Sequence, residues 1–438
     1  MRVKEITVNG LFGVFNHTIP MKLDDRITII MGPNGFGKTV LLQMINALFT
    51  LHFHQLRVTP FSQLRVEFDN NTSIMVSRNQ SDAGVSLDFD LTINSNQKEH
   101  FALKPLERPG HDAPIRLIER EADLQQVGPD TWVDIRTGKE LTLDEVLRQY
   151  KDLLPPSYRK LSITEPKWLQ QVKDSVHIRL IETQRLLTFS PSRRRPQFEG
   201  HPQMIASVIT YSEELSNAIQ SKLAEYAALS QSLDRTFPSR LVRGGPASDS
   251  TTEYLQKKLD DLEHKRARLI EAGLLDKGEE IDFVDLRWTD ETNRNVLSVY
   301  IQDVEKKLSI LDEMSDKLDL FKKIINGRFL YKQMSISKKQ GFIFTNSLGQ
   351  SLSPINLSSG EQHELVLLYE LLFKVQPNSL ILIDEPELSL HAVWQQQFLR
   401  DLTEITSLAN LDVLIATHSP LIIHDRDDLT VELKGPAI

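Results

Sequence analysis

Apolar and polar side chains alternate along the first part of the chain as they do in strands of a half-buried sheet. Residues 2–9 alternate in this way, and a second strand is expected over 15–21. Residues 26–31 (RITIIM) are largely β-branched and are followed by a glycine-rich loop, which is typical of a buried strand. Apolar positions at helical spacing then predict a helix over 38–50. A strand–loop–helix unit is therefore expected near the start of the chain.

Shorter alternating stretches follow this unit. They are QLRVEF (63–68), SIMVS (73–77) and VSLDFDLTI (85–93), and together they predict an antiparallel meander. A loop-rich region follows, with one helix expected over 142–150 and a further strand over 175–182.

Three apolar stripes with spacings of mostly three or four residues occupy the middle third of the chain. They consist of Tyr211, Leu215, Ile219, Leu223 and Tyr226, then of Leu255, Leu259, Leu262 and Leu269, and finally of Ile301, Val304, Leu308, Leu311 and Leu318. The turn-rich segment 238–251 separates the first two stripes and predicts an αα-hairpin. The third stripe is close to a heptad. Helices of ~25 residues reach only ~37 Å, so a short, coiled-coil-like arm is expected.

The β/α alternation returns in the last third. SLILIDE (379–385) and DVLIATH (412–418) predict short buried strands that end in polar residues, with helices expected over 361–375 and 391–408. Two α/β segments that flank a helical insert predict one head domain, discontinuous in sequence, with an arm emerging from it.

The amino-acid composition indicates the cellular compartment of this protein and excludes some kinds of site. The 438 residues include no cysteine, which excludes disulfides and thiolate metal sites and fits a reducing compartment. The sequence contains no run of 18 or more apolar residues, so no membrane-spanning segment is expected. The first residues, MRVKEITVNG, lack the apolar stretch of a signal peptide. We therefore expect a cytoplasmic protein. The net charge of −9 implies no attraction of the whole surface to nucleic acid.

A glycine-rich loop between the predicted strand and helix matches the P-loop pattern G-x-x-x-x-G-K-[ST] in full. It consists of Gly32, Pro33, Asn34, Gly35, Phe36, Gly37, Lys38 and Thr39. Its glycines let backbone N–H groups turn toward phosphates at a helix N-terminus. Lys38 is expected to contact the β- and γ-phosphates of ATP, and the Thr39 hydroxyl is expected to bind Mg²⁺.

Two further motifs lie in the last third. The strand LILIDE (380–385) ends in Asp384, a candidate Mg²⁺ ligand, and Glu385, a candidate base for the attacking water. An ordinary strand that ends in solvated acids is the alternative, but the complete P-loop favours the functional interpretation. LSSGEQ (357–362) precedes a predicted helix, and it is either an anion site or a simple helix cap. Its position between the P-loop and the acidic strand favours the anion site.

The order of P-loop, LSSGEQ, ILIDEPELSLH and ATHSP resembles the ABC-type ATPase superfamily, within it the RecF, SMC and OLD-type heads. The resemblance implies an α/β fold: a P-loop ABC-type ATPase head with a mixed sheet and an antiparallel β meander, interrupted by a helical, short coiled-coil-like insert. It implies an N-terminal lobe over 1–190, an arm over 191–335 and a C-terminal lobe over 336–438.

The same resemblance implies roles for single residues. Ser358, Ser359 and Gly360 match the signature that reaches across a dimer to the γ-phosphate of the partner. Gln184 is similar to the Q-loop glutamine that senses Mg²⁺ and the attacking water, although a plain surface glutamine stays the alternative. His418 is similar to the switch histidine that contacts the γ-phosphate.

Residues 386–391 occupy the position of the D-loop, which crosses the dimer interface in the family. Ser359 replaces a glycine and His391 an aspartate that transporter subunits usually carry, which disfavours a transporter. Phe12 and Phe15 follow the first strand and are candidates for contact with adenine, with core packing as the alternative for at least one of them.

The expected partners follow from these motifs. A shared ATP site implies a homodimer or a higher even oligomer. Arg185, Arg193, Arg194 and Arg195 are candidates for nucleic-acid phosphate, with a solvated loop as the alternative.

The resemblance extends to ATPase subunits of anti-phage systems of the Septu and PARIS kind. There a separate effector, a nuclease or toxin, accompanies the ATPase. We therefore expect an ATP-hydrolysing dimeric switch in defence. A RecF-like DNA-repair clamp is the alternative, and a transporter ATPase is the weakest interpretation.

Overall fold

The computed structural model divides the chain into two compact units. One unit combines Met1–Ser207 with Ser358–Ile438, and the other is Val208–Leu357. The expected lobe limits at 190/191 and 335/336 stay predictions. The structure describes residues 1–82, 84–94, 97–105, 165–182, 187–190, 203–243, 251–277 and 291–435, together with short stretches between 118 and 150. The helix expected over 142–150 falls partly outside these residues and stays a prediction.

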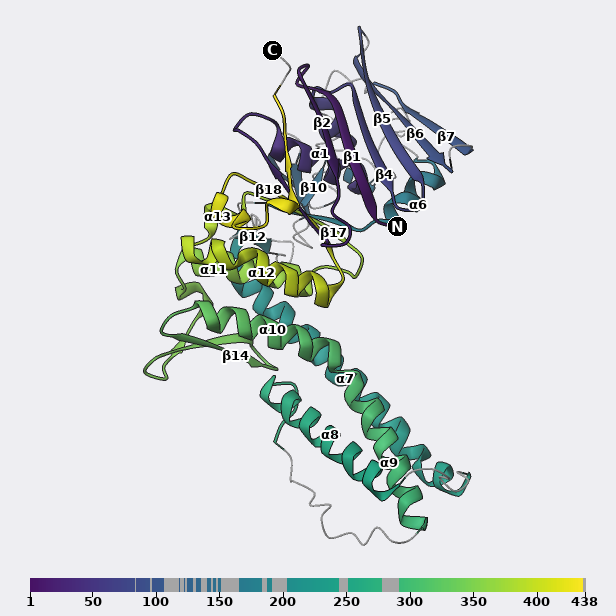
Figure 1. The fold of residues 1–438 in the computed structure, drawn as a ribbon, viewed down its shortest axis with the longest axis vertical. Helices are drawn as coiled ribbons and strands as arrows, with labels where there is room; N and C mark the ends of the chain where they lie inside the picture. The colour runs from purple at the N-terminus through teal and green to yellow at the C-terminus, as the bar shows by residue number, and fades with distance from the viewer. Residues whose placement is uncertain are drawn as a thin grey trace. The chain divides into compact units, whose positions relative to one another are not determined.

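The N-terminal half of the first unit contains a six-stranded antiparallel sheet (Figure 1). Its strands lie in the order β2 (Phe15–Pro20), β1 (Val3–Leu11), β4 (Gln63–Phe68), β5 (Thr72–Ser81), β6 (Gly84–Ile93) and β7 (Gln97–Leu103). Ile6 lies opposite Val66, and Val66 opposite Ile74, and all three are buried. Alternation thus gives this sheet one apolar face, and the predicted meander is confirmed.

Three helices supply the other side of this core. They are α1 (Lys38–Thr50), α2 (Phe53–Val58) and α6 (Lys167–Ser175), and their apolar residues join one buried cluster with the sheet. Because α6 ends at Ser175, the strand expected over 175–182 is shorter than predicted and covers only β11 (Ile178–Ile181).

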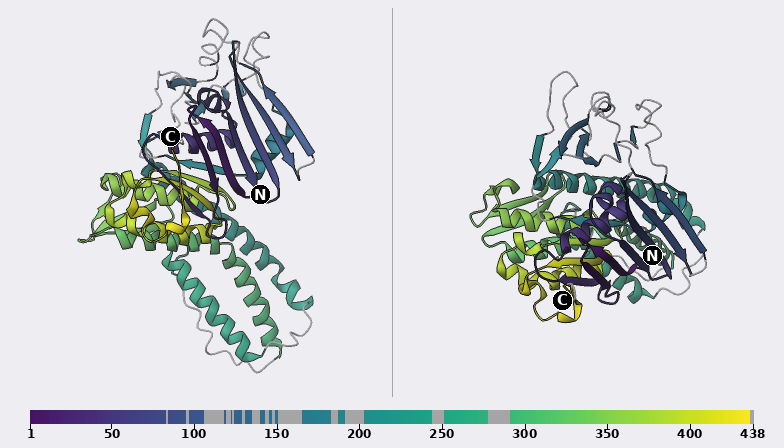
Figure 2. Two further views of the ribbon diagram at one scale, coloured as in Figure 1. Left: turned by 45° about the horizontal axis from the view of Figure 1, so that its top comes forward. Right: turned by 90° about the horizontal axis from the view of Figure 1, so that it is seen from above.

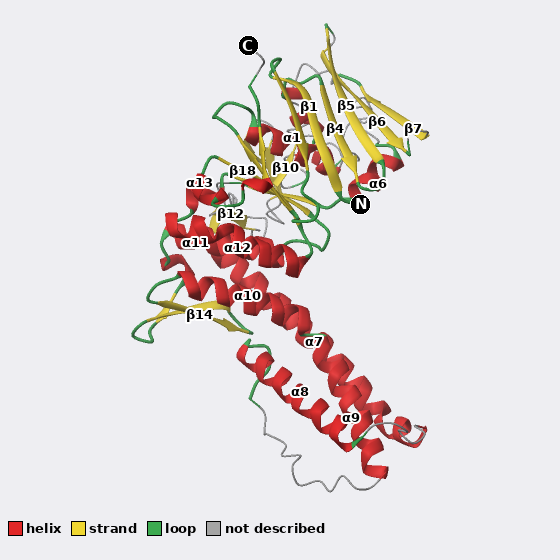
Figure 3. Cartoon of the chain, in the orientation of Figure 1, coloured by secondary structure: helices red, strands yellow, loops and turns green. Residues whose placement is uncertain are grey.

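A second sheet is entirely parallel. Its strands lie in the order β11, β17 (Leu380–Asp384), β18 (Asp412–Thr417), β3 (Ile27–Met31) and β19 (Thr430–Glu432). The middle strands are continuously apolar because both faces of such a sheet are covered. Helix α1 contacts β11, β17 and β18, and α11 (Ser359–Phe373) packs against α12 (Ala392–Ala409). The expected α/β class is confirmed, with the antiparallel and parallel strands in separate sheets (Figure 3).

Smaller elements complete the first unit. A three-stranded sheet contains β8 (Leu124–Gly128), β9 (Thr131–Asp134) and β10 (Glu140–Thr142), and β12 (Leu187–Ser190) pairs with β13 (Gln203–Ala206). Short helical turns are η4 (Pro386–Ser389), α13 (Pro420–Ile423) and η5 (Asp427–Leu429). No helix among the described residues is both long and apolar enough to cross a membrane.

The second unit is mainly helical. It contains α7 (Ser207–Arg243), α8 (Thr252–Glu271), α9 (Glu291–Ser309) and α10 (Asp312–Arg328), with a sheet of β14 (Lys332–Ser337), β15 (Gly341–Asn346) and β16 (Ser351–Leu352), then the turn η3 (Pro354–Asn356). Ion pairs tie α9 to α7 through Asp303 and Arg240, and to α8 through Glu305 and Lys258. The three helices run side by side (Figure 2).

Two predictions for this unit are wrong in detail. The turn expected from Pro238 begins later, because α7 continues through Pro238 to Arg243. Proline removes one helical hydrogen bond. Near this proline, the Thr236 hydroxyl donates to the Ser232 carbonyl, and Nη2 of Arg240 donates to the Leu233 carbonyl at 2.8 Å.

The third apolar stripe is not one heptad-like helix. It is divided between α9 and α10, with a turn at Leu311 whose N–H donates to the Leu308 carbonyl at 3.0 Å. This turn keeps Leu308, Leu311 and Leu318 all buried.

Candidate nucleotide site

Four chain segments meet at one edge of the parallel sheet. The P-loop follows β3, Glu385 follows β17, His418 follows β18 and Glu182 follows β11. These four strands are neighbours and run in the same direction, so their carboxyl ends lie together. Residues that are distant in sequence are thereby placed around one point.

The P-loop backbone depends on its glycines. Gly35 and Gly37 have φ values of 87° and 84°, in the left-handed region that favours glycine. A Cβ atom on Gly37 would lie 2.6 Å from Cδ2 of Leu11. Helix α1 begins at the next residue, so the loop leads directly into a helix N-terminus, where backbone N–H groups are available to an anion.

The Lys38 side chain folds back over this loop. Its Nζ donates to the carbonyls of Gly32 at 2.7 Å and Pro33 at 3.2 Å, and lies 3.4 Å from Nδ1 of His418. Burial lowers the pKa of Lys38, while the nearby carboxylates of Glu385 and Asp384 act in the opposite direction. The ammonium is therefore held where a phosphate would offer it a stronger acceptor.

Thr39 and Asp384 form the second part of the site. The Thr39 hydroxyl donates to Oδ1 of Asp384 at 3.1 Å. Burial raises the pKa of Asp384 from 3.8 to about 6; the hydrogen bond from Thr39 opposes this, and the charges of Glu385 and Glu182 add to it. A hydroxyl and one carboxylate, completed by substrate phosphates and water, are a donor set that fits Mg²⁺. Among the described residues, no group of three or more His, Asp or Glu side chains forms a further candidate metal site.

Glu385 and His418 complete the acidic side of the site. Glu385 has a φ of 41°, which is unusual for a non-glycine residue, and its N–H donates to the Ala416 carbonyl at 2.8 Å. Its Oε1 lies 3.5 Å from Nε2 of His418. Because the Lys38 ammonium has only donors, Nδ1 of His418 is the acceptor and Nε2 carries the ring proton, although Nε2 makes no hydrogen bond among the described residues. His418 thus lies between Lys38 and Glu385.

The LSSGEQ segment forms a capped helix start. The Ser358 N–H donates to Oε2 of Glu361 at 2.7 Å, and the Glu361 N–H donates back to the Ser358 hydroxyl at 3.4 Å, which is a capping box. Within the part of the chain that the structure describes, the N–H groups of Ser359 and Gly360 make no hydrogen bond. The cap therefore uses only some of the donors at this helix start.

Several predicted residues lie outside the described residues. They are Gln184, Arg185, Arg193, Arg194 and Arg195. Their roles stay predictions.

Sequence reasoning missed a histidine behind the P-loop. His17 is buried, and its Nε2 donates to the Phe36 carbonyl at 3.0 Å. Phe15 stacks on His17 and packs against Phe36, with ring centroids 5.7 and 5.3 Å apart. Phe15 therefore packs in the protein, whereas Phe12 is 43% exposed. The available signal was that His17 occupies an inward position in the alternation of β2.

Two glutamates were also missed. Glu182, at the end of β11, and Glu387, just after Glu385, both raise the pKa of Asp384 through their charge. Oε1 of Glu387 accepts the His418 N–H at 2.7 Å. For Glu182 the signal was its place at the end of a predicted strand; the structure shows that this strand is parallel to β17 and ends at the same edge as the P-loop.

Comparison with known proteins places this site in a family. A family profile described as "AAA domain, putative AbiEii toxin, Type IV TA system" matches residues 27–424. Protein ea59 of Escherichia phage lambda is 37% identical over 71 residues, 16% of this chain and 14% of that protein. The retron Ec83 probable ATPase of Escherichia coli is 34% identical over 94 residues, 19% of this chain and 17% of that protein. The matches thus span less than a fifth of these relatives.

Solved structures of SMC head domains align over nearly the whole chain at low similarity. The Smc head domain with an extended coiled coil, bound to the C-terminal domain of ScpA, from Pyrococcus furiosus has a TM-score of 0.33 and 12% identity, with 97% of this chain and 92% of that chain covered. The SMC head domain from Thermotoga maritima has a TM-score of 0.32 and 11% identity, with coverage of 98% and 93%.

Proposed function

We propose that this chain, which belongs to the family of AAA domains described as putative AbiEii toxin, Type IV TA system, binds ATP with Mg²⁺ and hydrolyses it. One observation carries the proposal: Lys38, Thr39, Asp384, Glu385 and His418 converge at one edge of the parallel sheet, joined by the contacts described above.

The residues have separate tasks in this proposal. Lys38 and the P-loop N–H groups bind the β- and γ-phosphates. Thr39 and Asp384 hold Mg²⁺, which supplies charge neutralisation on the phosphates when it is bound. Glu385 orients the attacking water and accepts its proton, and His418 contacts the γ-phosphate from between Glu385 and Lys38. Gln184 senses the metal and the water.

We further propose that the site is completed by a second copy of the chain. The unused N–H groups of Ser359 and Gly360 are donors available to a phosphate outside their own protomer's helix cap. In this arrangement, Ser358 to Gly360 of one protomer contact the γ-phosphate bound by the other. The protein then works as a homodimer or a higher even oligomer that is gated by nucleotide.

Substitution of Glu385 tests the chemical step. In Glu385→Gln the carboxamide keeps the shape but loses the basic oxygen, so ATP binding should persist, turnover should stop and an ATP-bound dimer should accumulate. Phosphate release measures the loss of turnover, and the mass from light scattering measures the accumulation of the dimer. Glu432→Gln, at an exposed position of β19, is the matched control. Equal turnover in Glu385→Gln and wild type would contradict the assignment of Glu385.

We propose a wider role in anti-phage defence, with a separate nuclease or toxin as effector. The description of the family as a toxin–antitoxin component and the short match to a retron ATPase support this role. Arg185 and Arg193 to Arg195 are proposed to contact nucleic acid. Purification of the native complex tests the role: a co-purifying effector supports defence, whereas DNA without an effector supports the RecF-like repair clamp instead.

A further inference from the structure

Residues 386–391, called the D-loop segment below, are joined to the loop of His418 by one side chain of α12. Nε2 of Gln395 donates to the carbonyls of Glu387 at 3.2 Å and Leu390 at 3.0 Å. Oε1 of the same amide accepts the Ser419 hydroxyl at 2.7 Å. A single planar amide therefore bonds two carbonyls of the D-loop segment and the residue that follows His418.

A second contact connects the same two loops. Oε1 of Glu387 accepts the backbone N–H of His418 at 2.7 Å. The other carboxylate oxygen of Glu387 is buried and has no hydrogen-bond partner among the described residues. The D-loop segment thus holds the backbone of His418 directly, and holds Ser419 through Gln395.

The outer side of the D-loop segment is open to solvent. Leu388 is 67% exposed, and Val393, just past the segment, is 53% exposed. These two apolar residues lie between Glu387 and Gln395 in the sequence. The contacts of Gln395 and Glu387 therefore join this exposed stretch to the His418 loop.

We propose that Gln395 and Glu387 are positioning residues that couple the D-loop segment to the His418 loop and thereby set the position of the histidine. The inference rests on the proposed ATPase function. The physical reason is the geometry of the amide: its N–H groups and its oxygen are rigidly linked, so neither loop can shift alone without loss of a hydrogen bond.

Three variants separate this coupling from a general effect on α12. Gln395→Ala removes the whole bridge, and Gln395→Glu keeps an acceptor but loses both donated bonds. Gln396→Ala is the matched control, because its side chain is the next one along the same helix and is exposed. Hydrogen exchange measured by mass spectrometry on the nucleotide-free chain reports on residues 386–391 and 417–420, and steady-state hydrolysis gives kcat and KM.

Both Gln395 variants should raise exchange in the two segments together. They should lower kcat on the order of tenfold with KM within about twofold of wild type, because positioning and not ground-state binding is lost. Gln396→Ala should match wild type in both measurements. If wild type hydrolyses no ATP, the proposed function fails, while the exchange result still decides the coupling.

Two outcomes would overturn the coupling. One is faster exchange in residues 386–391 of Gln395→Ala with wild-type exchange in 417–420. The other is an equal effect of Gln395→Ala and Gln396→Ala on kcat.

Discussion

The Thr39 hydroxyl bonds the Asp384 carboxylate at 3.1 Å across 345 positions of sequence. This contact joins the start of α1 to the end of β17. It holds the two candidate Mg²⁺ ligands next to each other, as a preorganised metal site requires.

The raised pKa of Asp384 predicts a pH dependence of stability. A carboxyl whose folded-state pKa is about 6, against an ordinary 3.8, binds its proton more tightly in the folded chain. Its stabilising contribution is therefore complete below 3.8 and is lost as pH rises through about 6. The melting temperature of nucleotide-free wild type should therefore fall as pH rises across this window. That of Asp384→Asn, whose side chain does not titrate there, should fall less. If melting temperature depended on pH in the same way in both proteins, the raised pKa of Asp384 would be contradicted.

Loss of Lys38 should remove nucleotide binding. Lys38→Ala deletes the buried ammonium that lies among the P-loop carbonyls and His418, and the affinity for ATP should fall on the order of a hundredfold or more because charge-assisted bonds to phosphate are lost. Titration calorimetry measures this. Lys98→Ala, at an exposed position of β7, should bind ATP like wild type. Unchanged affinity in Lys38→Ala would refute the role of the P-loop.

His17 should orient the P-loop through the Phe36 carbonyl. In a trans peptide the C=O of Phe36 and the N–H of Gly37 point in opposite directions, so a histidine that holds the carbonyl also directs this N–H toward the phosphate side of the loop. His17→Ala should weaken ATP binding by about 1 kcal/mol, roughly fivefold, and leave adenosine binding unchanged. Fluorescence titration with both ligands tests this. Thr18→Ala, on the outward side of β2, is the control, and an equal loss for adenosine would contradict the prediction.

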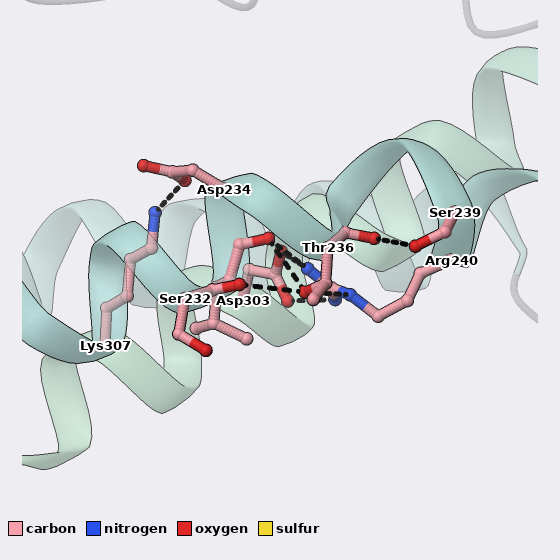
Figure 4. Close-up of polar contacts among 8 residues, drawn as sticks. Ser232, Asp234, Thr236, Ser239, Arg240, Asp303 and Lys307 are labelled. Carbon is pink, nitrogen blue, oxygen red and sulfur yellow. Dashed lines mark hydrogen bonds and ion pairs between the residues drawn. The ribbon is translucent and has the colours of Figure 1, made fainter.

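The helical unit should depend on one partly buried ion pair (Figure 4). Arg240 on α7 bonds both oxygens of Asp303 on α9, and the Asp303 side chain is only 5% exposed. Arg240→Ala would leave that carboxylate without its cation and should destabilise this unit by about 1–3 kcal/mol. Denaturant unfolding of the full chain, followed by helical circular dichroism, measures the loss. Arg235 is exposed on the same helix, so Arg235→Ala should unfold at the same denaturant concentration as wild type. An unchanged stability to denaturant in Arg240→Ala would show that the ion pair contributes little to this unit.

Much of this protein follows from local sequence. The P-loop, the apolar strand that ends in Asp384 and Glu385, and the helix start at Ser358 all emerge from patterns of a few residues. Glycines at required backbone angles, β-branched strands and a serine–glutamate cap determine local conformation by themselves. The α/β class was predictable for the same reason, because strands and helices alternate along the chain.

Contacts between distant residues were decided only by the tertiary structure. The order of β11, β17, β18 and β3 in the sheet brings His418 between Lys38 and Glu385. His17 and Gln395 belong to no motif, and the D-loop motif does not specify the contact of Glu387. These contacts exist because separate elements pack together. Helix α7 continues through Pro238, which local propensity reads as a break, as far as Arg243. Sequence periodicity encodes the secondary structure and the apolar face of each segment. The pairing of side chains depends on which segments become neighbours, and that is a property of the whole packed chain.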